Sequence, residues 1–362
     1  MGSTAGPETV GPWSADTLAE ILQAGVLAPS ADNRHPIRFE LEGQTVSLRR
    51  REGMLPPPGG YRRVLELLSL GAVLENIAVA AARHSMAAVI HLFPDPARPD
   101  LLCRLGWSPR DGGVEPLWEQ IPLRTTNRRL IFRGPALDPE AKASLLAALQ
   151  PGCHLHWLDA AAVRSRALRL VRLAETERFR NRVLHADLFA GIRFDVGWQR
   201  SCDEGLPPGA LGVERPLRPA FERMRYWPVI RLLNLLGTHW LLGLRAAWLP
   251  CRLAPHLGVI AVDVIDDASV VAAGRSFENL WLRTTALGMA LQPLPASALY
   301  ALEGAMHEAV PETLNRLLRA GWQALLPGQR PLMLFRLGRA AAMPVRTGRS
   351  PLDHFLQLTP QT

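Results

Sequence analysis

Two segments of the sequence carry side chains that suit the binding of a phosphate group. Residues 124–129 read Arg-Thr-Thr-Asn-Arg-Arg, and residues 344–352 read Pro-Val-Arg-Thr-Gly-Arg-Ser-Pro-Leu. A guanidinium donates two parallel hydrogen bonds to phosphate oxygens, and neighbouring hydroxyls add further donors. Each segment is therefore a candidate phosphate clamp. A solvated basic loop has the same composition, so the residues alone leave both interpretations open.

A third segment, residues 28–36, offers uncharged polar groups. It reads Ala-Pro-Ser-Ala-Asp-Asn-Arg-His-Pro and follows an apolar helical pattern. The prolines predict that the helix ends here and that a loop exposes the hydroxyl and amide groups. Such groups can hydrogen-bond the edge and the polyol of a ring cofactor. An ordinary turn between a helix and a strand uses the same residue types, and this alternative remains open.

The composition excludes several other chemistries. Lys142 is the only lysine among the 41 Lys and Arg residues, and it lies at the polar start of a predicted helix. A nucleotide-binding P-loop and a Schiff-base enzyme both need a lysine in the site, so neither is expected. The four cysteines are about fifty residues apart and form no C-x-x-C pair. We therefore expect no metal site, no disulfide framework and a cytoplasmic location.

The net charge of +8 raises the question of a nucleic-acid partner. The arginines are spread along the whole chain and no nucleic-acid-binding motif accompanies them, so none is expected. The most apolar stretch, residues 232–244, has 13 residues, whereas a membrane-spanning helix needs about 20. We therefore expect no membrane span. A buried helix or a hydrophobic lid is favoured over a membrane-surface segment.

Helical and strand patterns alternate along the chain. Predicted helices span residues 18–27, 69–84, 138–149, 160–184 and 274–286, and predicted strands span residues 38–41, 45–48, 88–93, 154–158, 259–265 and 332–337. The helices at 69–84 and 274–286 are apolar on nearly every side, so we expect both to be buried.

These two helices belong to an internal repeat. Residues 71–77 (Gly-Ala-Val-Leu-Glu-Asn-Ile) match residues 274–280 (Gly-Arg-Ser-Phe-Glu-Asn-Leu), 203 positions later. The preceding helices of the two series are offset by only about 127 positions, which predicts an insertion of roughly 75 residues between about 160 and 250. The repeated Glu75 and Glu278 need a cationic partner in apolar surroundings, so we expect structural ion pairs with arginine.

Taken in order, these motifs resemble the nitroreductase-like flavoprotein family, and most closely its tandem, Acg-type branch. The resemblance covers about residues 14–356 and is weakest in the insertion. It implies an α+β sandwich whose two fused halves, residues 14–118 and 119–356, form an intramolecular pseudo-dimer. It also implies one FMN at the interface between the halves, because only one full set of ligands is present.

The resemblance carries the cofactor-binding role onto particular residues. From the first half these are Ser30, Asn33 and His35, and from the second half they are Arg124, Thr126, Asn127, Arg128, Arg346 and Arg349. The family loop usually has Gln two residues after its Asn, and His35 would take the place of that amide. No side chain is implied as a catalytic acid or base.

The implied function is the transfer of hydride from NAD(P)H through FMN to a small electrophilic acceptor of nitro, quinone or enone type. Two alternatives remain: a protein that sequesters FMN, and a flavin-free binding protein without turnover. The implied partner is a small-molecule substrate, and the chain would be a monomeric pseudo-dimer or a homodimer. Trp227, Trp240 and Trp248 in the insertion suit either a lid over the site or plain core packing.

Overall fold

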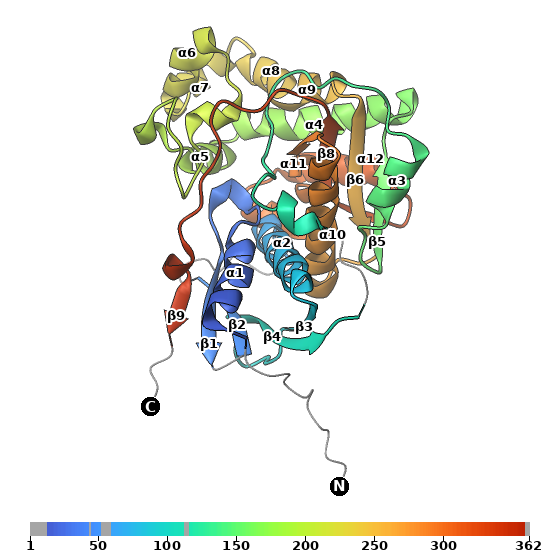
Figure 1. Cartoon of the computed structure of the whole chain (residues 1–362). Coiled ribbons are helices and arrows are strands. Elements are labelled where there is room, and N and C mark those ends of the chain that lie inside the picture. Colours follow the sequence, from blue (N-terminus) through green and yellow to red (C-terminus); the bar gives the residue numbers. More distant parts are fainter. Residues whose placement is uncertain (1–12, 43–44, 52–58, 112–115, 359–362) are drawn as a thin grey trace.

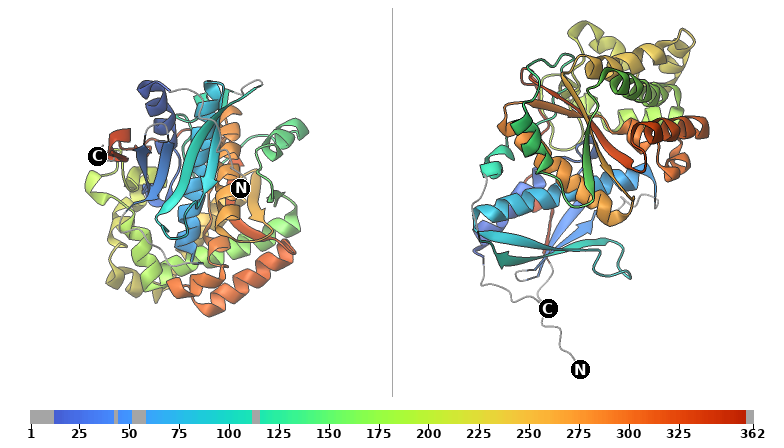
Figure 2. Two further views of the ribbon diagram at one scale, coloured as in Figure 1. Left: turned by 90° about the horizontal axis from the view of Figure 1, so that it is seen from below. Right: turned by 90° about the vertical axis from the view of Figure 1, so that its right-hand side faces the viewer.

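The computed structural model describes residues 13–42, 45–51, 59–111 and 116–358. Two long helices, α2 (Tyr61–Arg83) and α10 (Asp267–Ala286), pack against each other at the centre (Figure 1). One β-sheet lies beside each helix, and further helices cover the side of the molecule away from the chain termini (Figure 2). The fold class is α+β, as predicted.

The first sheet has the strand order β3-β4-β2-β1-β9. Its strands are β1 (Ile37–Glu42), β2 (Thr45–Arg50), β3 (Met86–Leu92), β4 (Leu101–Pro109) and the C-terminal β9 (Leu356–Leu358), and helix α1 (Ala15–Val26) precedes β1. The strands β1 to β4 pair antiparallel, while β9 adds to β1 in parallel. The end of the chain therefore completes a sheet that is otherwise built from the N-terminal residues.

The second sheet has the order β5-β6-β8-β7, and all of its pairs are antiparallel. Its strands are β5 (Cys153–Trp157), β6 (His256–Val262), β7 (Ala290–Pro293) and β8 (Arg330–Gly338), and helix α3 (Pro139–Leu146) precedes β5. In chain order, β5, β6, β7 and β8 take the same relative places as β1, β2, β3 and β4, so the two sheets share one strand order.

The segment between β5 and β6 is much longer than the one between β1 and β2. It contains α4 (Ala161–Arg180), α5 (Arg182–Ala190), α6 (Arg218–Arg223), α7 (Trp227–Asn234), α8 (Thr238–Gly243) and α9 (Leu249–Arg252). A second expansion, with α11 (Ala296–Leu299) and α12 (Glu312–Leu325), separates β7 from β8. The insertion predicted at about 160–250 lies within the segment between β5 and β6, and this second expansion was not predicted.

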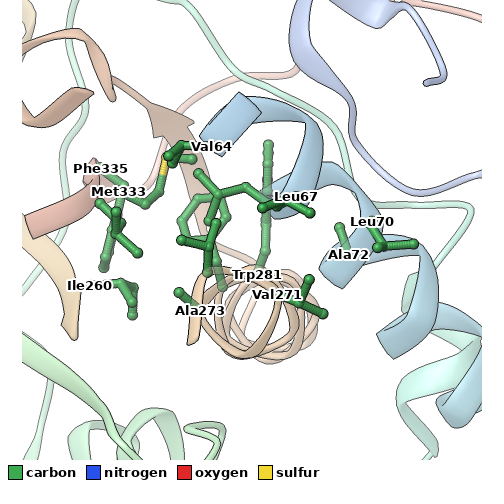
Figure 3. Close-up of a cluster of buried hydrophobic side chains, with 14 of the residues drawn as sticks. Val64, Leu67, Leu70, Ala72, Ile260, Val271, Ala273, Trp281, Met333 and Phe335 are labelled. Carbon is green, nitrogen blue, oxygen red and sulfur yellow. The ribbon is translucent and has the colours of Figure 1, made fainter. Parts of the chain in front are cut away.

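The two central helices approach so closely that only glycine fits at their contact. A Cβ atom on Gly71 would lie 2.2 Å from the carbonyl oxygen of Val271, and one on Gly274 would lie 2.3 Å from that of Leu68. Figure 3 shows the apolar side chains that α2 and α10 bury together with residues of the second sheet. The two glycine contacts are reciprocal, because each glycine lies against the carbonyl of the residue three positions before the other glycine.

Local sequence signals explain where several helices begin and end. Ser14 caps α1 by accepting a hydrogen bond from the Thr17 amide, and α10 begins with a capping box in which Asp266 and Ser269 bond reciprocally. The predicted helix 160–184 is interrupted, because Asn181 leaves the helical conformation and caps the N-terminus of α5 with its side chain. The prediction of one continuous helix was therefore wrong at this residue.

The apolar stretch 232–244 is not a buried helix. It forms the end of α7, a turn and α8, and the side chains of Leu235 and Leu236 are 81% and 83% exposed. Within the described ranges, α2 is the helix whose length and hydropathy would suit a membrane span, and 83% of that window is buried inside the protein. The four cysteines are unpaired.

Candidate functional site

A cavity of about 1270 Å³ lies between the two central helices and the helices of the insertion. Seven of the nine predicted cofactor-binding residues line it, namely Ser30, Asn33, Arg124, Thr126, Arg128, Arg346 and Arg349. They come from three segments that are far apart in the sequence: the loop after α1, the segment before α3, and the C-terminal segment after β8. His35 and Asn127 are not among the lining residues.

The loop after α1 presents two buried oxygen atoms without a protein hydrogen-bond partner. These atoms are the hydroxyl Oγ of Ser30 and the amide Oδ1 of Asn33. The loop makes a short 3₁₀ turn in which Asp32 and Asn33 both have positive φ, at 51° and 57°. The Asn33 Nδ2 donates to the carbonyls of Asp203 and Gly348, at 3.2 and 3.3 Å, which holds the turn in place. An unsatisfied buried polar atom costs about 1–3 kcal/mol, so both oxygens are poised for a ligand.

Arg124 and Arg349 lie side by side at the carboxyl end of α1. Arg124 donates from Nη2 to the Leu27 carbonyl at 2.9 Å, and Arg349 donates from Nη2 to the Ala28 carbonyl at 2.9 Å. The Arg124 guanidinium also stacks over the ring of Trp281, 4.7 Å from its centroid. The negative end of the helix dipole attracts both cations there.

Burial and mutual repulsion shift the pKa values of this group. Burial, together with the nearby Arg124, lowers the pKa of Arg349 to about 9. Glu278 forms an ion pair with Arg124, with Nε and Oε1 2.9 Å apart, yet burial raises the pKa of this carboxyl to about 7. Two buried guanidiniums share one carboxylate that is expensive to ionise, so the group favours an added anion.

The segment before α3 is fixed by buried hydrogen bonds. Asn127 donates from Nδ2 to the Ala341 carbonyl at 2.9 Å and accepts from the Arg129 amide at 3.0 Å. Asn127 is 3% exposed. Its side chain is therefore bonded within the protein, and its role as a cofactor ligand stays a prediction. The fully buried Arg336 of β8 bonds the carbonyls of Leu130 and Arg129 and so ties this segment to the second sheet.

His35 lies away from the cavity, beside the C-terminal strand. Its ring packs against that of Phe355, with centroids 5.1 Å apart, and the residue is 3% exposed. Burial, with a smaller effect of Arg349, lowers the pKa of His35 to about 3, so the imidazole is neutral. His35 therefore does not line the cavity, and its role in place of the family's glutamine amide stays a prediction.

The remaining predicted residues that line the cavity differ in their exposure and in their hydrogen bonds to the protein. Arg128 is half-buried, donates to the Ala210 carbonyl at 3.3 Å, and has its pKa lowered to about 10 by desolvation. Arg346 is exposed, and its guanidinium has no hydrogen-bond or ion-pair partner among the described residues. Thr126 pairs through its backbone with Leu291 and turns toward the cavity.

The insertion supplies one wall of the cavity, mostly with apolar side chains. They include Phe179, Leu184, Leu188, Phe221, Met224, Leu241 and Leu242. Trp227, Trp240 and Trp248 are not among the lining residues, so the covering wall is built by other side chains of the same segment.

Sequence reasoning missed a polar cluster that lines the cavity where α2 meets the insertion. Tyr61 donates its hydroxyl to Asp187 at 3.2 Å, Asp187 also pairs with Arg62, and the ring of Tyr61 contacts that of Tyr300 edge to face. Arg178 pairs with Glu175 in the wall that the insertion supplies, at 3.2 Å. These residues come from α2, α4, α5 and the turn after α11, and no motif surrounds any of them, so the sequence gave no signal for them.

The donor set fits a ligand that combines an anionic group with an uncharged polar part. Arginines and a threonine hydroxyl are donors that suit the anionic group. The unpartnered oxygens of Ser30 and Asn33 are acceptors that suit the uncharged polar part. The apolar wall from Phe277 and Trp281 of α10 and from the insertion suits a flat ring. FMN has these three parts, so the residues present fit it. Within the described ranges, no group of three or more His, Cys, Asp or Glu could hold a metal ion.

No protein-family model matches the sequence, and no curated protein matches it. Among solved structures, the chain is similar to the FMN-dependent nitroreductase NfnB from Mycobacterium smegmatis in complex with NADPH, with 21% identity, 67% of this chain and 96% of that chain covered, and a TM-score of 0.38.

It is also similar to a nitroreductase with bound FMN from Bacteroides fragilis, with 13% identity, 63% and 90% of the two chains covered, and a TM-score of 0.33. A third similar structure is iodotyrosine deiodinase bound to FMN and 3-iodo-L-tyrosine, with 12% identity, 65% and 94% covered, and a TM-score of 0.36. At these identities and TM-scores the matches do not establish the family of the chain.

Proposed function

We propose that this chain is a flavin-dependent oxidoreductase of nitroreductase type. It would bind FMN in the cavity and pass hydride from NAD(P)H to a small electrophilic acceptor of nitro, quinone or enone type. The observation that carries the proposal is the convergence of the three motif segments, residues 28–36, 124–129 and 344–352, on one cavity whose oxygens and arginines are poised for such a ligand. A cytoplasmic location and the absence of a nucleic-acid partner remain predictions.

The proposal includes the tandem architecture, in which residues 14–118 and 119–356 are two halves of a pseudo-dimer. Three observations support it: the common strand order of the two sheets, the reciprocal glycine contacts of α2 and α10, and matched polar pairs across the same helices. The Asn279 amide donates to Glu75 at 2.7 Å. On the other helix Asn76 lies close to Glu278, although its amide donates to the Ala24 carbonyl at 3.0 Å. Glu75 also pairs with Arg275, so the predicted ion pairs of both glutamates with arginine are confirmed.

When bound, FMN supplies the two-electron hydride chemistry. Arg124, Arg346 and Arg349 would bind its phosphate, and Thr126 would add a hydroxyl donor. The oxygens of Ser30 and Asn33 would accept hydrogen bonds from the uncharged part of the cofactor. The apolar wall of the insertion excludes water and thereby strengthens every charged contact inside the cavity.

The first experiment is a titration of the purified chain with FMN, followed by flavin fluorescence. Ser30→Ala and Arg346→Ala are expected to weaken binding by about 1–2 kcal/mol each, or roughly five- to thirtyfold, because each removes one contact to the cofactor. Both variants should fold normally, since Ser30 Oγ has no partner to lose and Arg346 is exposed. Arg129→Ala is the matched control: Arg129 lies in the same motif but bonds the carbonyls of Ala341 and Ala342 outside the cavity.

The result also separates the two alternatives. A chain that binds no FMN at all would contradict the proposal and leave a flavin-free binding protein. A chain that binds FMN but is not reduced by NADH or NADPH under anaerobic conditions would be a protein that sequesters the cofactor. Bleaching of the bound flavin by either nucleotide, followed by reoxidation with a quinone or nitroaromatic acceptor, is the expected outcome.

A further inference from the structure

The most exposed apolar surface of the described chain is formed by α7, α8 and the turn between them. This surface, the α7–α8 hairpin, consists of residues 226–241. Its exposed side chains, with their exposed fractions, are Tyr226 (52%), Leu232 (66%), Leu235 (81%), Leu236 (83%), Trp240 (44%) and Leu241 (66%). Contiguous apolar exposure of this kind marks a contact surface, whereas isolated exposed leucines do not.

The hairpin is held firmly on the body of the protein, so its exposure does not come from a loose loop. Ile230 is fully buried, and the Asn234 amide donates to the Phe179 carbonyl at 2.8 Å. Behind α8, Gly243 lies so close to α4 that a Cβ atom would be 2.1 Å from the Thr176 hydroxyl. A rigid base therefore presents the leucines outward, on the side of the molecule away from both termini (Figure 1).

The charged side chains of the hairpin and of the residues that directly flank it are cationic, while Glu222 lies just before this stretch and Arg245 is paired with Glu214. Residues 223–262 contain five arginines and no aspartate or glutamate. Arg223, Arg225 and Arg231 form no ion pair with a carboxylate among the described residues. The hairpin thus combines protruding leucines, an exposed Trp and Tyr, and unneutralised arginines.

We propose that the chain docks on the surface of an anionic lipid bilayer through the α7–α8 hairpin. Leucines at the tip would enter the boundary between headgroups and acyl chains, Trp240 and Tyr226 would lie at headgroup level, and the arginines would bind lipid phosphates. The apolar stretch is too short to span a membrane but suits this shallow position. The exposure of Leu235 and Leu236 excludes the buried helix that the sequence favoured, whereas Leu241 and Leu242 of the same stretch do line the cavity.

A second copy of the chain fits this surface less well than lipid does. In a twofold dimer the same patch faces itself, so the arginines of one hairpin would be brought against those of the other. No carboxylate within residues 223–262 is present to offset that repulsion. Lipid phosphates supply the complementary charge.

The hairpin is continuous with the cavity. Leu241, Leu242 and Arg245 line the cavity, and Leu241 is also 66% exposed on the hairpin. Docking would therefore bring one wall of the cavity next to the lipid. The docking proposal does not depend on FMN binding and is tested without it.

The test is co-flotation of the full chain with vesicles of equal parts phosphatidylglycerol and phosphatidylcholine, compared with vesicles of phosphatidylcholine alone. We expect binding to the anionic vesicles that weakens as salt is raised, because screening acts on the arginine contacts. The double variant Leu235→Asp/Leu236→Asp should lower the bound fraction by about tenfold or more, since it replaces the inserted side chains by anions. Arg225→Glu/Arg231→Glu should weaken binding to the anionic vesicles as well.

The matched control is Leu146→Asp/Leu317→Asp, which changes two leucines that are 49% and 47% exposed on α3 and α12. It should bind vesicles as the unchanged chain does. Failure of the unchanged chain to bind anionic vesicles would overturn the proposal, and so would equal binding by the Leu235→Asp/Leu236→Asp variant. If that variant instead converts a dimer to a monomer on size-exclusion chromatography while vesicle binding is absent, the hairpin is a self-contact and the proposal is wrong.

Discussion

Glu278 is a carboxylate with no exposed surface, and its single arginine partner does not offset the cost of burying it. Its pKa is raised to about 7 by burial, with Arg124 opposing the shift. In the unfolded chain the same carboxyl has an ordinary glutamate pKa near 4.3. The native state therefore holds a proton that the unfolded state has already released between these two values.

The raised pKa of Glu278 makes the native state less stable, relative to the unfolded state, as the pH rises. The contribution of Glu278 to stability is fully present below about pH 4 and is lost as the pH rises to about 7. We expect Glu278→Gln to remove this part of the profile, so that between pH 5 and pH 8 the free energy of unfolding falls by roughly 1–3 kcal/mol less than in the unchanged chain. Urea unfolding of both chains at pH 5 and at pH 8 measures this difference in unfolding free energy. The exposed Glu119→Gln serves as control, and an unaltered pH slope in Glu278→Gln would contradict the assignment.

At the scale of the elements, the central pair of helices depends on two glycines. Gly71→Ala or Gly274→Ala would place a methyl group within 2.2–2.3 Å of a backbone carbonyl of the other helix. Because backbone cannot rotate away as a side chain can, the helices must separate, and we expect each variant to lose roughly 2–4 kcal/mol of unfolding free energy. Gly106→Ala is the control, since its Cβ would meet no atom nearer than 3.8 Å. Equal thermal midpoints for Gly71→Ala and Gly106→Ala would show that the helices tolerate the separation.

The same two glycines show how far the sequence could predict the fold. The match of residues 71–77 to 274–280 located both central helices, because a buried helix with a close crossing restricts nearly every position. The pairing of β9 with β1 could not be predicted, since parallel pairing across more than 300 residues leaves no local pattern. Among the site residues, too, those within a local motif could be predicted and those brought together only by the fold could not. Arginine- and serine-bearing loops were visible as motifs, whereas Tyr61, Asp187 and Tyr300 meet only through packing of the inserted helices.

The whole molecule has two sheets with the same strand order, but the residues expected to bind the cofactor are distributed unequally between its two halves. The loop after α1 carries Ser30 and Asn33, whereas the corresponding segment of the second half reads Gln150-Pro151-Gly152-Cys153. The arginine segment 124–129 precedes the second half, and its counterpart before the first half is the segment from Thr9 to Trp13, which has no arginine. Residues 9–12 lie outside the described part of the chain, so the comparison there rests on sequence alone.

This asymmetry predicts the stoichiometry of cofactor binding. A homodimer of a single-unit protein would bind two ligands by symmetry, but a fused chain with one complete ligand set should bind one. We expect calorimetric titration with FMN to saturate at one equivalent per chain, whether the chain is monomeric or dimeric in solution. Ser30→Ala should weaken that one event without uncovering a second. A stoichiometry of two per chain would mean that the second half binds through residues other than the motif set, and the single-site assignment would fail.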